Sequence, residues 1–182
     1  MKHRISSLLL TGIFLLCAGC AGPAAPGQEE PASLQFFAMD TVMSVTAYGE
    51  QGQTGVQAAR EAVNRLDGLL SRTDPDSQIS QLNAHAGDGT AVEVEPDVAE
   101  LLAFAQSVSQ QLPGDFDITI APVMDAWGFT TEERHVPAAE TLSAALALVD
   151  STQLEVDGDT STARLLQAGM EVDLGAVAKG FA

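Results

Sequence analysis

Residues 171–182, EVDLGAVAKGFA, predict how the last part of the chain is built. Met170 and Val172 alternate with polar neighbours, as expected at the end of a strand. Asp173 follows where that strand ends, and Gly175 permits a tight backbone turn directly after it. The pattern therefore predicts a strand that delivers a carboxylate to the rim of a sheet.

The residues that follow this turn resemble the start of a helix. Residues 176–178 are small and apolar, and a helix start can bind phosphate through its unpaired N–H groups. Lys179 adds a positive charge, and Asp173 can accept a hydrogen bond from a hydroxyl or a ring N–H. The alternative is an ordinary strand-to-helix turn with a solvated lysine.

The composition is that of a folded but strongly acidic protein. The chain has 182 residues, 46% of them hydrophobic, and a formal net charge of −17. Such a surface repels nucleic acid, so no nucleic-acid partner is expected. An anionic ligand such as a nucleotide needs a cation beside this protein, which makes a divalent metal worth considering.

The N-terminus predicts a bacterial lipoprotein. Residues 1–19 combine a basic start with a short apolar run, the pattern of a signal peptide. Small residues precede Cys20, which we expect to become the lipidated first residue; ordinary signal cleavage nearby is the alternative. Residues 20–33 predict a flexible tether, and residues 34–182 the folded domain, which contains no cysteine.

Residues 34–113 predict a strand and two amphipathic helices. A long β-type run covers residues 34–48, with a bulge or bend expected around residues 38–41. Apolar residues at helical spacing predict a helix from Thr54, capped by a box that includes Gln57. A second helix is predicted from Pro96.

Residues 114–129, GDFDITIAPVMDAWGF, are unusual in their content. Pro122 limits any helix across its middle, so a structured loop is expected. Such a loop beside a pocket can use its carboxylates to accept N–H groups of a heterocycle and its aromatic rings to stack on it. The alternative is a loop that plugs the core with its aromatic rings. The residues concerned are Asp115, Asp117, Trp127 and Phe129.

The last third of the chain predicts one helix and three strands. Pro137 is expected to open the helix. Apolar alternation then predicts strands at residues 154–156, 163–165 and 170–173, joined by turns as a meander.

Four stretches, in this order, resemble one family, the FAD:protein FMN transferases or ApbE family of flavin-transfer lipoproteins. The first stretch is FAMDT (residues 37–41) and the second is LSRTDPDSQISQLN (residues 70–83). The third is residues 114–129 and the fourth is VDLGAVAKG (residues 172–180). The resemblance covers essentially all of residues 34–182.

This resemblance implies an α+β domain with a mixed or antiparallel sheet and packed helices, which binds FAD and Mg²⁺. The implied reaction cleaves the FAD pyrophosphate, passes FMN to a Thr or Ser hydroxyl of an acceptor protein and releases AMP. Mg²⁺ would neutralise the pyrophosphate and polarise the phosphoryl group. The enzyme would be anchored by lipid to the extracytoplasmic face of the cell membrane.

The resemblance also implies roles for individual residues, although it names no catalytic side chain. The Ala176 carbonyl is the implied magnesium ligand. Thr73 stands near the position of a tyrosine that the family often has. The residues implied to bind FAD are Met39, Thr73, Asp115, Phe116, Asp117, Asp173 and Lys179.

Three readings compete with a transferase. The first is a Mg²⁺-dependent FAD pyrophosphatase, which differs only in its acceptor. The second is a non-catalytic flavin-binding lipoprotein, and an anchored domain of unrelated role is a third. Family members continue well past the Lys-Gly turn, so we expect this chain to be an N-terminal portion that lacks further metal ligands and forms at best half of the site.

Overall fold

The computed structural model describes residues 30–131 and 133–182; the signal segment, Cys20 and most of the tether lie outside them. The helices are α2 (Gly52–Leu70), α3 (Gln78–Ala84), α4 (Pro96–Gln111), α5 (Ala121–Ala126), α6 (Ala139–Leu146) and α7 (Ala178–Phe181). The strands are β1 (Ala32–Ala38), β2 (Thr41–Ala47), β3 (Val92–Glu93), β4 (Leu154–Asp157) and β5 (Thr162–Leu165), with the 3₁₀-helix η1 (Ser151–Gln153) before β4.

The first two strands form a hairpin, which corrects the single bent strand predicted for residues 34–48. β1 and β2 are antiparallel, and Ala38 pairs with Thr41 across a two-residue turn. Met39 and Asp40 occupy that turn with φ of 49° and 55°. Positive φ at both central residues is the signature of a type I′ turn, one of the two favoured turns for a two-residue hairpin loop. The turn was not predicted from the sequence because Asn and Gly, the usual residues of such a turn, are absent from it.

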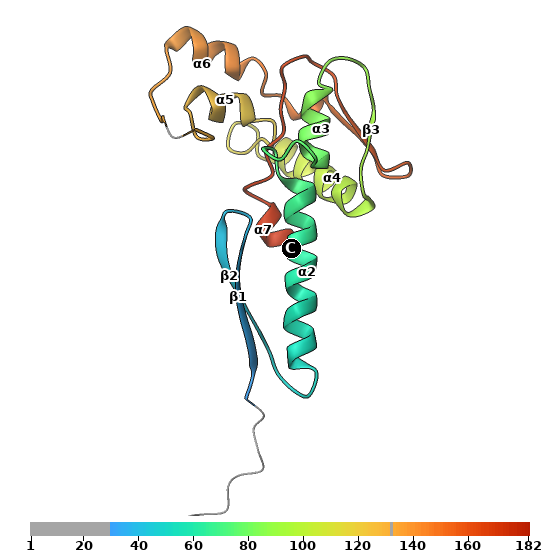
Figure 1. Cartoon of the computed structure of the whole chain (residues 1–182). Coiled ribbons are helices and arrows are strands. Elements are labelled where there is room, and N and C mark those ends of the chain that lie inside the picture. Colours follow the sequence, from blue (N-terminus) through green and yellow to red (C-terminus); the bar gives the residue numbers. More distant parts are fainter. Residues whose placement is uncertain (1–29, 132) are drawn as a thin grey trace, which may run out of the picture.

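Helix α2 lies along the hairpin, and together they form an arm that projects from the rest of the domain (Figure 1). Its buried side chains include Val56, Val63, Leu66 and Leu70, so the predicted apolar stripe is confirmed. The predicted capping box is not formed, because the N-cap is Gln51 and no side chain caps the helix.

The second sheet has three antiparallel strands in the order β3-β5-β4. The third strand predicted for residues 170–173 is not formed. Residues 170–173 leave β5 and run beside the third stretch instead, with a parallel bridge between Ile120 and Glu171. The Asp173 N–H donates to the Ile118 carbonyl at 2.8 Å. This exchange of neighbours places Asp173 beside the third stretch.

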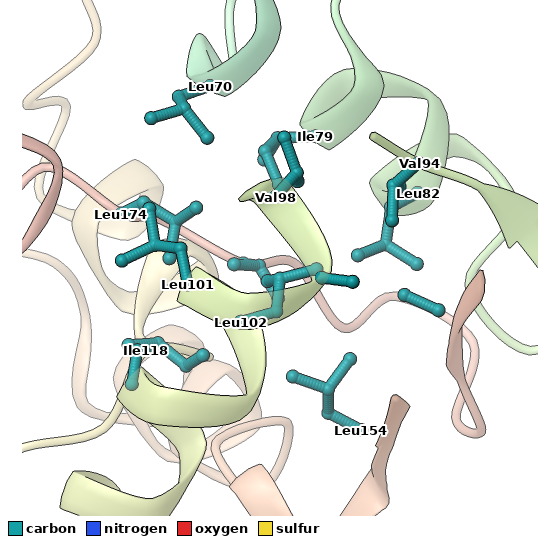
Figure 2. Packing of buried hydrophobic residues seen from close by; sticks show 14 of the residues in the cluster. Leu70, Ile79, Leu82, Val94, Val98, Leu101, Leu102, Ile118, Leu154 and Leu174 are labelled. Atoms are coloured by element: carbon teal, nitrogen blue, oxygen red, sulfur yellow. The ribbon is translucent and has the colours of Figure 1, made fainter. Parts of the chain in front are cut away.

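The core is built around α4, which begins at Pro96 as predicted. Figure 2 shows Val98, Leu101 and Leu102 of this helix among side chains from α3, β4 and the fourth stretch. Leu101 and Leu102 are 1% and 0% exposed. Truncation of such a side chain costs about 2–5 kcal/mol. The core therefore holds the fourth stretch, through buried Leu174, against α4.

Two proline predictions need correction. Pro122 does not prevent a helix: it lies in the first turn of α5, where its missing N–H needs no partner. Pro137 does not open the next helix, since α6 begins at Ala139 and its N-cap is Ala138.

The helices and the two small antiparallel sheets confirm the predicted α+β class. Within the described residues, no helix is both long and apolar enough to cross a membrane.

Candidate functional site

The guanidinium of Arg72 is the most connected charged group of the described structure. Its side chain is 8% exposed. It donates two hydrogen bonds to the carboxylate of Asp125 and one, at 3.2 Å, to Glu171. Its Nε lies 2.9 Å from Oδ2 of Asp173, an ion pair that lacks hydrogen-bond geometry. Arg72 thus joins the second stretch to Asp125 of the third, to Asp173 of the fourth and to Glu171 just before the fourth.

The pKa values in this cluster follow from burial and from Arg72. Burial by itself would lower the pKa of Arg72, but the hydrogen bond to Asp125 and the three neighbouring carboxylates raise it. Burial would raise the pKa of Asp125, but the bond from Arg72 and one from Thr130 lower it. The pKa of Glu171 is raised by burial and by repulsion from Asp125, which Arg72 only partly opposes. Arg72 is therefore a permanent cation that keeps Asp125 ionised.

Hydrogen bonds between side chains and backbone groups fix the fourth stretch on both sides of Asp173. The Asn83 amide donates to the Val172 carbonyl at 3.0 Å, and the Val172 N–H donates back to it at 2.7 Å. The Asn83 side chain thus pairs with the backbone of Val172 as the backbone of a neighbouring strand would. This pair of bonds connects the end of the second stretch to the fourth. Asp173 Oδ1 accepts the Gly175 N–H at 2.8 Å. The carboxylate therefore caps its own turn with one oxygen and meets Arg72 with the other.

The second stretch is held by serines. The Ser71 hydroxyl accepts the backbone N–H groups of Thr73 and Asp74 at 3.2 and 3.1 Å. Buried Ser77 caps α3 by accepting the Ser80 N–H and donates to the Ser71 carbonyl. These bonds make residues 71–77 a fixed loop, from which Arg72 and Thr73 reach a cavity.

That cavity has a volume of about 290 Å³, near the lower end of the roughly 300–1,000 Å³ typical of small-molecule sites. All four stretches line it. The side chains come from the hairpin turn, the loop after α2, the end of α5 and the turn before α7: Met39, Asp40, Arg72, Thr73, Met124, Phe129, Thr130, Asp173 and Lys179 among others. The structure thus brings together four of the seven residues predicted to bind FAD: Met39, Thr73, Asp173 and Lys179.

The apolar wall of the cavity includes the side chains of Met39 and Phe129. Met39 stands in the positive-φ hairpin turn. Phe129 is 53% exposed and its ring stacks on that of Trp127, with centroids 6.4 Å apart. The ring of Phe129 is therefore not buried in the core, which was one of the two roles expected for the third stretch. It lines a pocket, which was the other.

Lys179 supplies a second positive charge to the cavity. Among the described residues, no carboxylate lies within 4.0 Å of its ammonium group. Of the helix start predicted at residues 176–178, only Ala178 is helical: residues 175–177 form a turn, and α7 begins at Ala178 and has four residues. So short a helix has little dipole, and the charge of Lys179 is the stronger attraction for an anion.

Residues 115–117 do not line this cavity. Asp115 is exposed, and Phe116 packs against the core. Asp117 is engaged inside the protein: its carboxylate accepts the Thr119 N–H at 2.8 Å, the Thr119 hydroxyl at 2.7 Å and the Ser151 N–H at 3.1 Å. Their predicted contact with FAD remains a prediction.

The Ala176 carbonyl belongs to the turn between Asp173 and α7. Ala176 lines a second cavity of about 460 Å³ between α4 and α7, beside Phe104 and Phe181. No group of three or more His, Cys, Asp or Glu side chains within residues 30–131 and 133–182 is placed to hold a metal ion. The described residues do not by themselves make a complete metal site.

Sequence reasoning missed Arg72 and Asp125. Both lie inside stretches that the sequence analysis singled out, but they are 53 positions apart and no known motif links them. One feature of the sequence could have indicated Arg72: a basic residue in a chain with 8 basic and 25 acidic residues has many carboxylates available to it.

The arrangement can now be compared with known proteins. A family model described as the ApbE family matches residues 39–182. The chain belongs to the ApbE family. It is 29% identical to the FAD:protein FMN transferase of Haemophilus influenzae, an alignment that covers 100% of this chain and 54% of that protein. It is 31% identical to the FAD:protein FMN transferase of Treponema pallidum, over 93% of this chain and 49% of that protein.

Solved structures of ApbE proteins agree with this membership. An ApbE protein from Thermotoga maritima superposes with a TM-score of 0.76 at 26% identity, covering 84% of this chain and 50% of that one. The apo flavinyl transferase ApbE of Pseudomonas stutzeri gives 0.73 at 27% identity, over 87% and 52%. The chain therefore spans about half the length of the relatives it matches.

Proposed function

We propose that the protein is an FAD:protein FMN transferase. The observation that carries the proposal is the convergence of the four stretches on one cavity, although they are spread over residues 37–180. The names of the ApbE relatives support the same reaction class. In this reaction an acceptor hydroxyl attacks the FMN phosphorus, the pyrophosphate bond breaks, AMP leaves and the hydroxyl proton is lost.

The cavity suits one part of a dinucleotide. With about 290 Å³ it encloses only a portion of FAD, and the rest extends over the surface. Its lining combines the cations Arg72 and Lys179 with thioether and aromatic surface at Met39 and Phe129. A ligand with both a charged phosphate and a flat ring system matches this combination.

The residues have separate roles in this proposal. Lys179 offsets the negative charge of the phosphates, which an acidic protein would otherwise repel. Asp173 accepts a hydrogen bond from the nucleotide, and Met39 packs on the flavin or the atoms beside it. Thr73 contributes a hydroxyl where the cavity opens to solvent.

We also propose dependence on Mg²⁺, which when bound supplies charge neutralisation and polarisation of the phosphoryl group. The Ala176 carbonyl is the one ligand we assign to it. Because the described side chains do not complete a metal site, no step is assigned to the ion. The location is a proposal as well: a lipid on Cys20 holds the domain at the extracytoplasmic face of the membrane, where it modifies a Thr or Ser of an acceptor flavoprotein.

The test is turnover by the protein expressed from its complete gene. It is incubated with FAD and Mg²⁺, with and without a candidate acceptor, and AMP, free FMN and protein-bound flavin are measured. Transfer predicts AMP and acceptor-bound FMN in equal amounts, and loss of both when a chelator removes Mg²⁺. Free FMN released at full rate without acceptor would indicate a pyrophosphatase instead. FAD binding without AMP release would indicate a non-catalytic flavoprotein.

A further inference from the structure

Arg72 has an atom that the folded protein leaves without a hydrogen bond. Its Nε–H is buried and has no acceptor of good geometry among the described residues, although Asp173 Oδ2 is 2.9 Å away. Arg72 also lines the cavity, whereas its bidentate partner Asp125 does not. A small rotation of the Asp173 carboxylate would complete the missing hydrogen bond.

The two carboxylate oxygens of Asp173 have different partners. Its backbone N–H is fixed by Ile118, and its Oδ1 by the Gly175 N–H. Its Oδ2 has the ion pair with Arg72 and retains the capacity to accept a further hydrogen bond. The side chain is 16% exposed, at the wall of the cavity. The orientation of Oδ2, and of its remaining capacity to accept a hydrogen bond, therefore depends on Arg72.

We propose that Arg72 is a positioning residue of the nucleotide site, which acts through Asp173 by fixing the carboxylate so that Oδ2 accepts a hydrogen bond from bound FAD. The inference rests on the proposed function, because it takes FAD as the ligand of the cavity. Asp125 and Glu171 anchor the far side of the guanidinium, so that its Nε edge is the part turned toward Asp173.

A purely structural Arg72 is the competing explanation. Such a residue would stabilise the fold and would affect FAD only through general loosening of the loop. Two mutations that act on one contact are non-additive, whereas two that act independently multiply their effects on the dissociation constant. A double-mutant cycle on FAD affinity therefore separates positioning from a structural role.

The experiment titrates the complete protein with FAD and follows flavin fluorescence. The variants are R72Q, D173N and the R72Q/D173N pair, with R72K as a milder change that keeps the charge. R65Q is the matched control: Arg65 also pairs with two carboxylates, Glu95 and Asp97, but it is exposed and outside the cavity. Thermal unfolding of each variant shows whether it is folded.

We expect R72Q and D173N each to weaken FAD binding about tenfold, the scale of one hydrogen bond to a charged group. The double variant should be no weaker than D173N alone, R72K should be intermediate and R65Q should bind as the wild type does. If R72Q fails to fold, the cycle of R72K with D173N gives the same test.

Multiplied losses in the double variant, or wild-type affinity of a folded R72Q or R72K, would overturn the inference and leave the proposed function intact. A wild-type protein that binds no FAD would overturn the proposed function itself, and this inference with it.

Discussion

Arg72 Nε and Asp173 Oδ2 lie 2.9 Å apart at the wall of the cavity, although the two residues are 101 positions apart in the chain. The same guanidinium binds Asp125, 53 positions along the chain, and Glu171, 99 positions along it. One cation therefore fixes the mutual position of three of the four stretches. The stability of the site should depend on this cluster and on its protonation.

Asp125 should stabilise the protein at neutral pH but not in acid. Its pKa is held below the ordinary 3.8, so its contribution is fully present above that value and is lost as the pH falls through the lower, folded-state pKa. The variant D125N should lose about 1 kcal/mol at pH 7, a modest figure because the side chain is 40% exposed. Urea unfolding at pH 7 and at about pH 3 should show this difference shrinking.

In the same cluster, the pKa of Glu171 is shifted in the direction opposite to that of Asp125, so its effect on stability depends on pH in the opposite way. Burial and repulsion from Asp125 raise its pKa above 4.5, so it favours the folded state only when protonated, and this contribution is lost as the pH rises through the raised pKa. E171Q should therefore unfold at the same urea concentration as the wild type or a slightly higher one at pH 7. A loss of stability in E171Q larger than that in D125N would contradict this assignment.

The sequence predicted the parts of the fold that depend on local periodicity. The apolar stripes of α2 and α4 were readable because their buried residues recur at three and four positions. The hairpin was not, because Met39 is a poor residue for positive φ and the turn contains no glycine. Helix α5 was excluded on account of Pro122, yet proline is tolerated in a first helical turn.

The residues of the candidate site were predictable only in part, and the contacts between them were not predictable. Asp173 and Lys179 were found because a strand end, a glycine and a lysine follow each other in one short stretch. Arg72 was missed because its partners are set by tertiary packing, which local spacing does not encode. The separation of residues 115–117 from the cavity is likewise a tertiary fact, fixed by the bonds of Asp117 to Thr119 and Ser151.

Met39 should show a conflict between stability and function. Its φ of 49° costs about 1–2 kcal/mol relative to a relaxed residue, and Asn tolerates that conformation better. M39N should raise the free energy of unfolding by about 0.5–1 kcal/mol, by analogy with other strain-relieving changes. It should also weaken FAD binding, because the thioether at the cavity is lost.

S161N is the control for that variant, since Ser161 has a φ of 51° in the turn between β4 and β5, away from the cavity. It should gain stability without a change in FAD affinity. If M39N binds FAD as tightly as the wild type, the packing role assigned to Met39 is wrong.

Gly128 should be irreplaceable in the turn that presents Phe129. Its φ is +71°, and a Cβ added there would lie 2.3 Å from the Glu133 carbonyl oxygen. G128A should cost about 1–3 kcal/mol, the range for enforced backbone strain. The matched control is G68A in α2, where an added Cβ would meet no atom within 4 Å. G68A should raise the free energy of unfolding by up to about 1 kcal/mol, because Ala favours a helix more than Gly does. Equal unfolding midpoints for the two variants would contradict this.

Cys20 should determine where the protein resides. In cells grown with labelled palmitate, the wild type should carry the label and sediment with membranes. C20S should lose the label and leave the membrane fraction, because one lost anchor removes most of the membrane affinity. C17S should behave as the wild type. Label retained on C20S would place the lipid, and the cleavage site, elsewhere.

The most direct test of a flavin-nucleotide cavity is an equilibrium titration of the complete protein with FAD in the presence of Mg²⁺. K179Q removes the cation beside the predicted phosphate position, and R164Q removes an exposed arginine that pairs with Glu155 outside this cavity. We predict saturable binding by the wild type, unchanged in R164Q and weakened several-fold in K179Q, with a smaller dependence on salt. No saturable binding by the wild type, or equal affinities of K179Q and R164Q, would contradict the placement of FAD in this cavity.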